Sequence, residues 1–193
     1  MLRRQLLKTS LIRVSALVAG ALGLPPFISA FGSPLTEPST IAITLANALR
    51  SIGSEPCLVA AASLEASQSN DGAFRFHLRS AGIDTSGAMI IAEALRSLPN
   101  REASSLVSLS LSYNEALGDA GAIALAYALP PTLHELGLVG CGIGDQGGEA
   151  LLQWAKQAPR LRMMCIEENK FSYEIRAQFA KLAREKSRLF VIV

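Results

Sequence analysis

One nine-residue pattern recurs along this 193-residue chain and constrains its fold more than any other feature. Its first, fourth and sixth positions are apolar, and its ninth is Asn, Cys or Ala. Four copies lie 33, 27 and 28 residues apart, and their fourth positions are Phe76, Leu109, Leu136 and Met164. A fifth copy begins near the end, with Leu189 and Ile192 each 28 residues after Leu161 and Met164, so Ile192 is expected to face inward. The recurrence predicts a repeat protein in which each unit packs on its neighbours.

A second block, rich in Gly, Ala and Leu, follows each copy of the first. Its apolar residues recur at three- and four-residue spacing, which predicts amphipathic helices over residues 87–95, 121–129 and 147–155. Asp119 and Asp145 lie two residues before the helix glycines, where a carboxylate can accept hydrogen bonds from the free amides of a helix start. Residues 38–52 have the same form and predict the helix of a first, partly lost repeat.

The two blocks together specify an α/β architecture. Alternating apolar residues in a strand point to one side, so Leu111, Leu138 and Ile166 are expected to face the core of adjacent parallel strands. Asn114 and Asn169 end their strands and are expected to bond the backbone of the neighbouring repeat. Strands need less width than helices, so the stack curves. We therefore expect a solenoid with parallel strands on the concave face and helices on the convex face.

The pattern Leu-x-x-Leu-x-Leu-x-x-(Asn or Cys), followed by Gly-Asp-x-Gly, resembles the ribonuclease-inhibitor-like leucine-rich repeats, whose units are about 28 residues long. The resemblance covers residues 73–193 and, more weakly, 36–70. It implies a solenoid over residues 36–193 with about four repeats and a terminal strand. Residues 57–70 fit poorly, and the 33-residue step implies an insertion near residues 100–105.

The first thirty residues have the composition of a targeting segment. Four cations and no acid occupy residues 1–13, no charge occurs in residues 14–31, and the run Ile28-Ser29-Ala30 supplies small residues before Phe31. The run beginning at Arg3 and Arg4 resembles the twin-arginine motif, which implies export to the periplasm. An organellar transit peptide is the alternative for residues 1–30, and an uncleaved membrane anchor is a third reading. Membrane association is expected only if this segment is retained.

The remaining composition gives no sign of catalysis. Beyond the N-terminal cations, 14 basic residues face 16 acidic ones, so nucleic-acid binding is not expected. The three cysteines have neither zinc-site spacing nor the pattern of a disulfide framework. His77 and His134 lie in different repeats without a nucleophile nearby, and Glu167, Glu168 and Glu174 are interpreted as a solvated face. We expect no catalytic, cofactor or metal site, and hence a protein that is not an enzyme.

The expected function is protein binding through the outward positions of the strands. These positions change from basic in the first readable repeat, through neutral, to acidic in the fourth. They include serines and glycines in the middle repeats, and Val139. The candidate partner-binding residues are Arg75, His77, Arg79, Tyr113, Glu135, Glu167 and Glu168. The sequence does not identify the protein partner.

The alternative function is structural. The chain closes with five apolar residues, 189–193, placed where a fifth strand begins, and no capping unit follows them in the sequence. A terminal strand offers unpaired backbone groups to a neighbour. We therefore also consider a subunit that assembles end-on through an uncapped C-terminal repeat, including a homodimer through the edge strand. An accessory domain of an enzyme is a weaker alternative.

Overall fold

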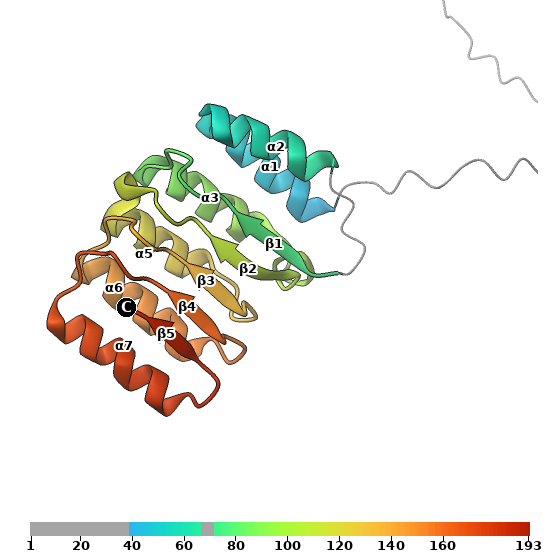
Figure 1. Ribbon diagram of the computed structural model, residues 1–193. Helices are drawn as coiled ribbons and strands as arrows, with labels where there is room; N and C mark the ends of the chain where they lie inside the picture. The colour runs from blue at the N-terminus through green and yellow to red at the C-terminus, as the bar shows by residue number, and fades with distance from the viewer. Residues whose placement is uncertain (1–38, 67–71) are drawn as a thin grey trace, which may run out of the picture. The chain divides into compact units, whose positions relative to one another are not determined.

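The computed structural model describes residues 39–66 and 72–193, which form two layers, a parallel sheet and a row of helices (Figure 1). The expected targeting segment, residues 1–30, lies outside the described residues. The five strands are β1 (Phe74–His77), β2 (Leu106–Ser110), β3 (Glu135–Gly137), β4 (Met163–Cys165) and β5 (Phe190–Ile192). The helices are α1 (Thr40–Ile52), α2 (Glu55–Ala66), α3 (Thr85–Ser97), α4 (Asn100–Ala103), α5 (Gly118–Ala128), α6 (Asp145–Gln157) and α7 (Tyr173–Glu185), with a 3₁₀ turn at Glu115–Leu117.

The strands follow one another in chain order, and every neighbouring pair is parallel. Each of the strands β1 to β4 is followed by a helix that returns the chain to the start of the next strand, as in a leucine-rich-repeat solenoid. The solvent-facing side of the sheet is the concave face and the helix row is the convex side. The predicted fold class is therefore confirmed.

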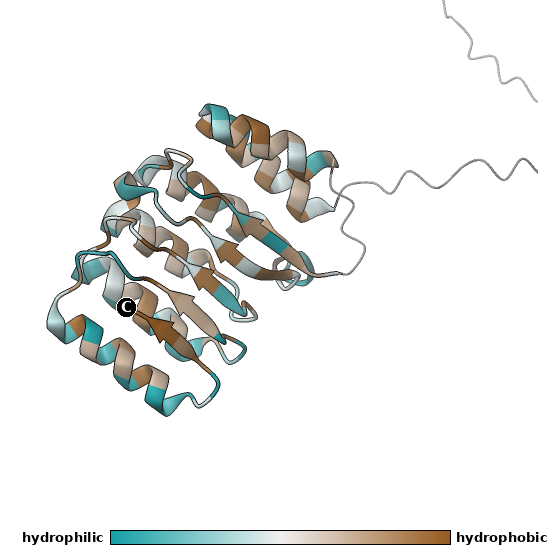
Figure 2. Cartoon of the chain, viewed as in Figure 1, coloured by the Kyte–Doolittle hydropathy of each residue, from teal (hydrophilic) through white to brown (hydrophobic). Residues whose placement is uncertain are grey.

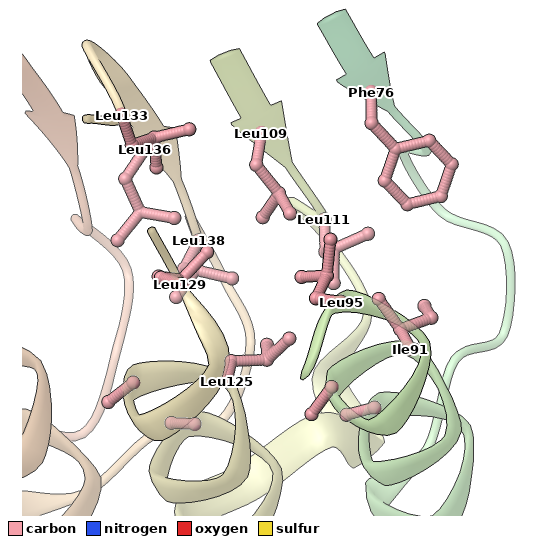
Figure 3. Close-up of a cluster of buried hydrophobic side chains, with 14 of the residues drawn as sticks. Phe76, Ile91, Leu95, Leu109, Leu111, Leu125, Leu129, Leu133, Leu136 and Leu138 are labelled. Carbon is pink, nitrogen blue, oxygen red and sulfur yellow. The ribbon is translucent and has the colours of Figure 1, made fainter. Parts of the chain in front are cut away.

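The core lies between the two layers, where strand leucines meet helix residues of the same and the next repeat (Figure 3). Leu111, Leu138 and Ile166 are fully buried, as predicted. Small residues keep the layers and repeats close: a Cβ at Gly147 would lie 2.6 Å from the Ile143 side chain and 3.0 Å from Ala122. The Gly and Ala content of the helices is thus explained by close packing.

The strand-end asparagines hold adjacent repeats together, as expected. Asn114 accepts hydrogen bonds from the amides of Ala81 and Ile83 at 2.9 and 3.0 Å. Its side-chain amide donates to the carbonyls of Leu78 and Leu111 at 3.1 and 2.8 Å. Asn169, two repeats later, makes the equivalent four bonds to Cys141, Ile143, Leu138 and Ile166. Because these backbone groups are buried, each asparagine removes a desolvation cost that several unpaired groups would carry.

The helix-start aspartates bridge repeats rather than capping their own helices, which corrects the sequence interpretation. The Asp119 carboxylate accepts from the amides of Gly144 and Gly147, both at 2.8 Å, at the start of the next helix. Asp145 likewise accepts from the amide of Ser172 at 2.7 Å. Each carboxylate satisfies free amides at the start of the following helix.

The fifth strand has a different register from the one that the 28-residue spacing predicted. Met164 pairs with Val191, so Val191 takes the inward position and packs on the core. Ile192 pairs with Cys165 on the concave face and is 51% exposed. Leu189 lies one residue before β5 begins, whereas its counterpart Leu161 lies two residues before β4 begins. A shift of one residue reverses the side of the sheet that every strand residue faces. The expectation of an inward Ile192 is therefore wrong.

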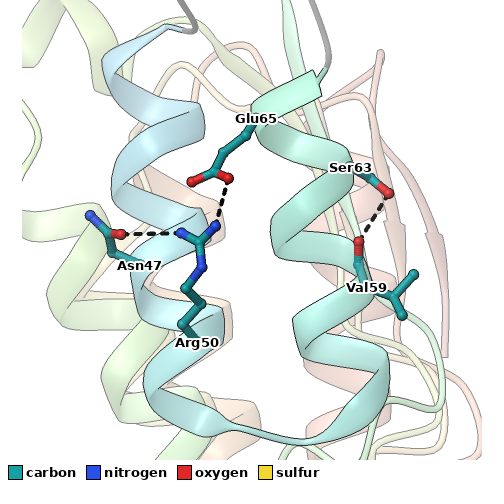
Figure 4. A network of polar contacts seen from close by, with 5 residues as sticks. All are labelled: Asn47, Arg50, Val59, Ser63 and Glu65. Carbon is teal, nitrogen blue, oxygen red and sulfur yellow. Dashed lines mark hydrogen bonds and ion pairs between the residues drawn. The ribbon is translucent and has the colours of Figure 1, made fainter.

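The N-terminal region replaces a strand with a second helix. α1 forms where expected and packs against α3, while α2 covers residues that fitted the repeat poorly and packs on α1. Arg50 of α1 pairs with Glu65 of α2 at 2.5 Å and also bonds Asn47, and Ser63 bonds the carbonyl of Val59 within α2 (Figure 4). The insertion expected near residues 100–105 is the short helix α4.

Candidate functional site

The sheet register places outward residues of different repeats in rows across the concave face. Neighbours in a row lie about 4.8 Å apart because that is the spacing between strands. One row contains Arg75, Ser108, Glu135, Met163 and Phe190. The next row contains His77, Ser110, Gly137, Cys165 and Ile192. Residues 115 positions apart in the sequence therefore lie in the same row, and the two rows form one continuous strip.

In the first two repeats the polar side chains of this strip contact one another. His77 Nε2 lies 2.7 Å from the Ser108 hydroxyl oxygen, across β1 and β2. The Arg79 guanidinium lies 3.8 Å from the centre of the Tyr113 ring, in the geometry of a cation–π contact. Two of the predicted binding residues, Arg79 and Tyr113, are therefore in contact, and His77 lies around the same hollow of the concave face.

A ridge borders the strip where the strands end and the chain turns. Ser80, Tyr113, Gly140 and Glu168 all adopt left-handed backbone conformations, with φ between 50° and 61°. Gly140 has no side chain, and the Tyr113 ring lies beside it; a Cβ there would be 3.2 Å from the ring. The tyrosine hydroxyl thereby comes within 3.4 Å of Glu168 Oε1. The absence of a side chain in one repeat lets residues of the repeats on either side meet.

A hollow of about 330 Å³ lies over Gly137 in the middle of the strip. A Cβ at Gly137 would lie 2.7 Å from the Ser110 hydroxyl oxygen, so only glycine leaves this space open. Glu135 lines the hollow from β3, and Glu167 lines it from a position two residues beyond the end of β4. One carboxylate oxygen of Glu167, Oε2, is buried and has no hydrogen-bond partner among the described residues.

Several positions predicted to be outward are nearly covered by their neighbours. Ser108, Ser112 and Val139 are 4%, 6% and 7% exposed. They form the floor of the strip, whereas Arg75, His77, Arg79, Glu135 and Glu168 are exposed and Tyr113 and Glu167 are half-buried. The difference arises because small residues in the middle repeats lie between longer side chains on either side.

The cysteines do not form a reactive centre. All three are free, and burial raises the pKa of the Cys141 thiol to about 11. Cys165 is half-buried on the concave face, where burial, then Glu167 and Glu135, raise the pKa of its thiol. A raised pKa leaves little thiolate at neutral pH, so neither group is an activated nucleophile.

The sequence interpretation missed an apolar patch at the C-terminal end of the strip. Met163, Phe190 and Ile192 are 44%, 70% and 51% exposed and lie on the concave side of β4 and β5. β5 is hydrophobic along its length in Figure 2. The correct strand register reveals this patch, because in the predicted register Ile192 was assigned to the core.

The convex side also carries a groove, of about 740 Å³, between α5 and α6. Exposed Tyr127 and buried Trp154 line it, and the Trp154 indole donates to the carbonyl of Leu129 at 3.2 Å. None of the predicted binding residues borders this groove. Within residues 39–66 and 72–193, His, Cys, Asp and Glu form no cluster able to hold a metal ion. None of the helices there is long and apolar enough to span a membrane.

The helix row ends in polar residues at the C-terminal side. Arg176 of α7 takes the place that Gly148 has one repeat earlier, where a Cβ would lie 2.9 Å from Ile175 and Phe171 of the following repeat. Arg176 is exposed and donates to the Phe171 carbonyl at 3.2 Å. A further helix could not pack as closely on α7 as α7 packs on α6. The sheet, by contrast, ends at β5 with one edge unpaired among the described residues.

Comparison with known proteins agrees with this architecture. A family model described as Leucine Rich repeat matches residues 102–126 and 130–152, which run from before β2 through most of α5 and from before β3 through most of α6. A search of curated proteins finds no match to the chain. The chain thus contains leucine-rich repeats, and its described part from α1 to β5 folds as a leucine-rich-repeat solenoid.

Proposed function

We propose that this protein is a binding module whose protein partner docks on the concave face. The observation that carries the proposal is the continuous strip to which each of the five strands contributes side chains. Repeat proteins present extended surfaces of this kind for binding, and leucine-rich repeats are generally protein-interaction modules. The predicted residues Arg75, His77, Arg79, Tyr113, Glu135, Glu167 and Glu168 all lie along this strip or its ridge.

The chemistry of the strip favours a protein over other ligands. Four strand spacings of about 4.8 Å make it about 19 Å wide, which suits a protein segment. Cations occupy one end and carboxylates the middle, so a uniformly anionic ligand such as nucleic acid would meet repulsion at Glu135, Glu167 and Glu168. Proteins supply both signs of charge and apolar side chains in a single surface.

Arg79 and Tyr113 are the expected energetic centre of the first two repeats. Tyr and Arg are the residue types that most often dominate interface energies. Their mutual contact at 3.8 Å holds both side chains in place before a partner arrives. Less conformational entropy is then lost on binding.

Site-specific photo-cross-linking tests the proposal. A benzophenone amino acid would replace Met163 on the concave face or, as the matched control, Tyr127 on the convex side; both are large and exposed. In cells of the source organism we expect a discrete adduct from position 163 that is lost when Arg79 and Tyr113 are changed to Ala. Adducts from position 127 alone, or an adduct at 163 that persists in the double variant, would contradict concave binding.

We also consider end-on assembly through the open edge of β5. The unpaired edge of β5 and the exposed apolar side chains of Phe190 and Ile192 favour such assembly. The exposed Arg176 disfavours it on the helix side, because a further helix could not pack closely on α7 there. Sedimentation of the full chain over a wide concentration range separates the two functions. A concentration-dependent dimer that Phe190→Ser with Ile192→Ser abolishes supports assembly, whereas a monomer at all concentrations eliminates the homodimer.

The proposed compartment follows from the N-terminal sequence. We infer export by a twin-arginine route, with removal of residues 1–30. Changing Arg3 and Arg4 to Lys is expected to block export, because that route requires the arginine pair and a general secretory route requires only positive charge. Normal export of the double-lysine variant would exclude the twin-arginine route.

A further inference from the structure

A hollow with two carboxylates in the middle of the concave face adjoins an apolar patch at its C-terminal end. The hollow lies over Gly137, with Glu135 and Glu167 on one side and His77, Arg79 and Tyr113 of the first two repeats on the other. Neither carboxylate forms an ion pair with a described residue. The buried oxygen of Glu167 has no hydrogen-bond partner there, and leaving a carboxylate oxygen unpaired in a desolvated place is costly. A cationic group entering the hollow would remove that cost.

A reporter of this local field is Cys165, which lies between the hollow and the patch. Glu167 and Glu135 both contribute, after burial, to raising the pKa of its thiol. Two carboxylates from different repeats thus both disfavour a negative charge at the Cys165 thiol. Arg79 also borders the hollow, from the side of the first repeat, but its guanidinium lies on the Tyr113 ring and forms no ion pair with Glu135 or Glu167. The two carboxylates are therefore available to a partner.

The apolar patch is directly adjacent. Met163 pairs with Phe190 in one row, and Cys165 pairs with Ile192 in the next. Met163, Phe190 and Ile192 are all more than two-fifths exposed, at the end of a sheet whose other exposed concave residues are polar or charged. A cluster of exposed apolar side chains beside charged ones is typical of a protein interface.

We propose that the partner contributes an extended segment in which a Lys or Arg lies close to apolar residues. This inference rests on the proposed function. The basic side chain enters the hollow between Glu135 and Glu167, and the apolar side chains pack on Met163, Phe190 and Ile192. One to two strand spacings, about 5–10 Å, separate the two subsites, so about two to three residues of extended chain connect them.

Charge complementarity decides between this occupant and others. An anionic lipid surface would bring its phosphates against Glu135, Glu167 and Glu168, so the apolar patch does not fit a membrane of that kind. A second copy of the chain would have to bring one of its own exposed cations to the hollow. In that case dimerisation, rather than peptide binding, would depend on Glu135 and Glu167.

Selection of short peptides tests the inference. The full chain would be immobilised and exposed to a phage-displayed library of random peptides of about twelve residues, long enough to cross the sheet with slack on both sides. We expect the enriched sequences to carry Lys or Arg within about three residues of Leu, Ile, Phe or Met. Affinities of the synthetic peptides would then be measured in solution by fluorescence anisotropy, at low and high salt.

The variants separate the two subsites from each other and from the scaffold. Glu135→Gln with Glu167→Gln keeps shape and removes charge, and is expected to weaken binding at least tenfold and to abolish most of its salt dependence. Phe190→Ser with Ile192→Ser is expected to weaken binding by a similar factor without changing its salt dependence. Glu149→Gln with Tyr127→Ser, on the convex groove, is the control and should leave affinity unchanged. Thermal unfolding of each variant checks that it remains folded.

The outcomes distinguish this inference from the proposed function. Peptides without a basic residue, or peptides unaffected by the Glu135 and Glu167 changes but weakened by Arg79→Ala or Tyr113→Ala, would overturn the inference and leave concave binding intact. Peptides that respond only to the convex variant would overturn both. Failure to enrich any sequence would show that an extended segment is not the occupant. A dimer lost on removing the two carboxylates would assign the hollow to a second copy.

Discussion

The two halves of the concave face differ although the scaffold beneath them is the same. Across β1 and β2, His77 lies against Ser108 and Arg79 against Tyr113, so polar groups contact one another. Across β3 to β5, a Glu167 oxygen lacks a partner among the described residues and Phe190 is 70% exposed. In the first half, the polar side chains are held by contacts with one another. In the second half, a carboxylate oxygen and large apolar side chains remain without such contacts and are available to a partner.

The inward residues do not share this difference. The same leucine pattern fills the core under both halves, and Leu109, Leu136 and Met164 are all at most 1% exposed. Because inward positions maintain the fold and outward positions are free to vary, repeats with equal cores can carry unlike surfaces. Stability and binding should therefore be separable by mutation.

The largest effect is expected from the shared core. Leu138→Ala should lower the free energy of unfolding by about 2–5 kcal/mol, since it removes a fully buried side chain between the layers. Ile192→Ser, on the concave side of β5, should change it by less than about 0.5 kcal/mol. Urea denaturation measures both. Similar losses in the two variants would contradict the register of β5.

The ridge between the halves gives a smaller effect with a matched control. Gly140 and Gly82 both have φ above 50°, so Ala at either should cost about 1–2 kcal/mol of backbone strain. Only Gly140 lies beside the Tyr113 ring, whereas the space around Gly82 is open. We expect Gly140→Ala alone to shift the Tyr113 ring resonances by NMR. Equal Tyr113 shifts in the two variants would show that the contact across Gly140 does not position the ring.

The organisation of the first half is testable by a double-mutant cycle. Arg79→Met and Tyr113→Leu, singly and together, should give a coupling of about 0.5–1 kcal/mol in the free energy of unfolding, as a cation–π contact at the surface provides. Additive losses would mean that the two side chains are not held together in solution. The first half would then be no better organised than the second.

The smallest expected effect is on the alkylation rate of Cys165, the thiol in the second half of the concave face. Cys57 and Cys141 are fully buried, so Cys165 should be the thiol that iodoacetamide modifies in the folded protein. Glu135→Gln with Glu167→Gln removes charges that raise the pKa of Cys165, which lowers that pKa. Below the pKa more thiolate then forms at any given pH, and alkylation accelerates. An unchanged rate would place the carboxylates too far away to act on this site.

Much of the fold could be predicted because each repeat places the same residue types at a regular spacing in the sequence. The spacing from Leu109 to Leu136 and Met164 gave the inward positions of the central strands, and Asn114 and Asn169 behave as expected. The bonds of Asp119 to the next helix could not be predicted, because spacing within one repeat does not reveal partners in another.

The candidate site was predicted only in part. Periodicity located Arg79, Tyr113 and Glu168 on one face, but their contacts depend on Gly140 leaving room for the ring. The apolar patch was missed because a single-residue difference before β5 reverses which side Ile192 faces. The sequence pattern could not detect that difference, since Leu189 keeps the 28-residue spacing and the strand after it does not.

Protection of Cys165 tests concave binding most directly, because this half-buried thiol lies within the strip and requires no mutation. The alkylation rate of Cys165 in the full chain would be measured at mildly alkaline pH, with and without a saturating amount of a peptide selected on the wild-type protein. Concave binding predicts that the rate falls at least tenfold and that the fall follows the fraction of protein bound. A bound peptide that leaves the rate unchanged would contradict binding at this face.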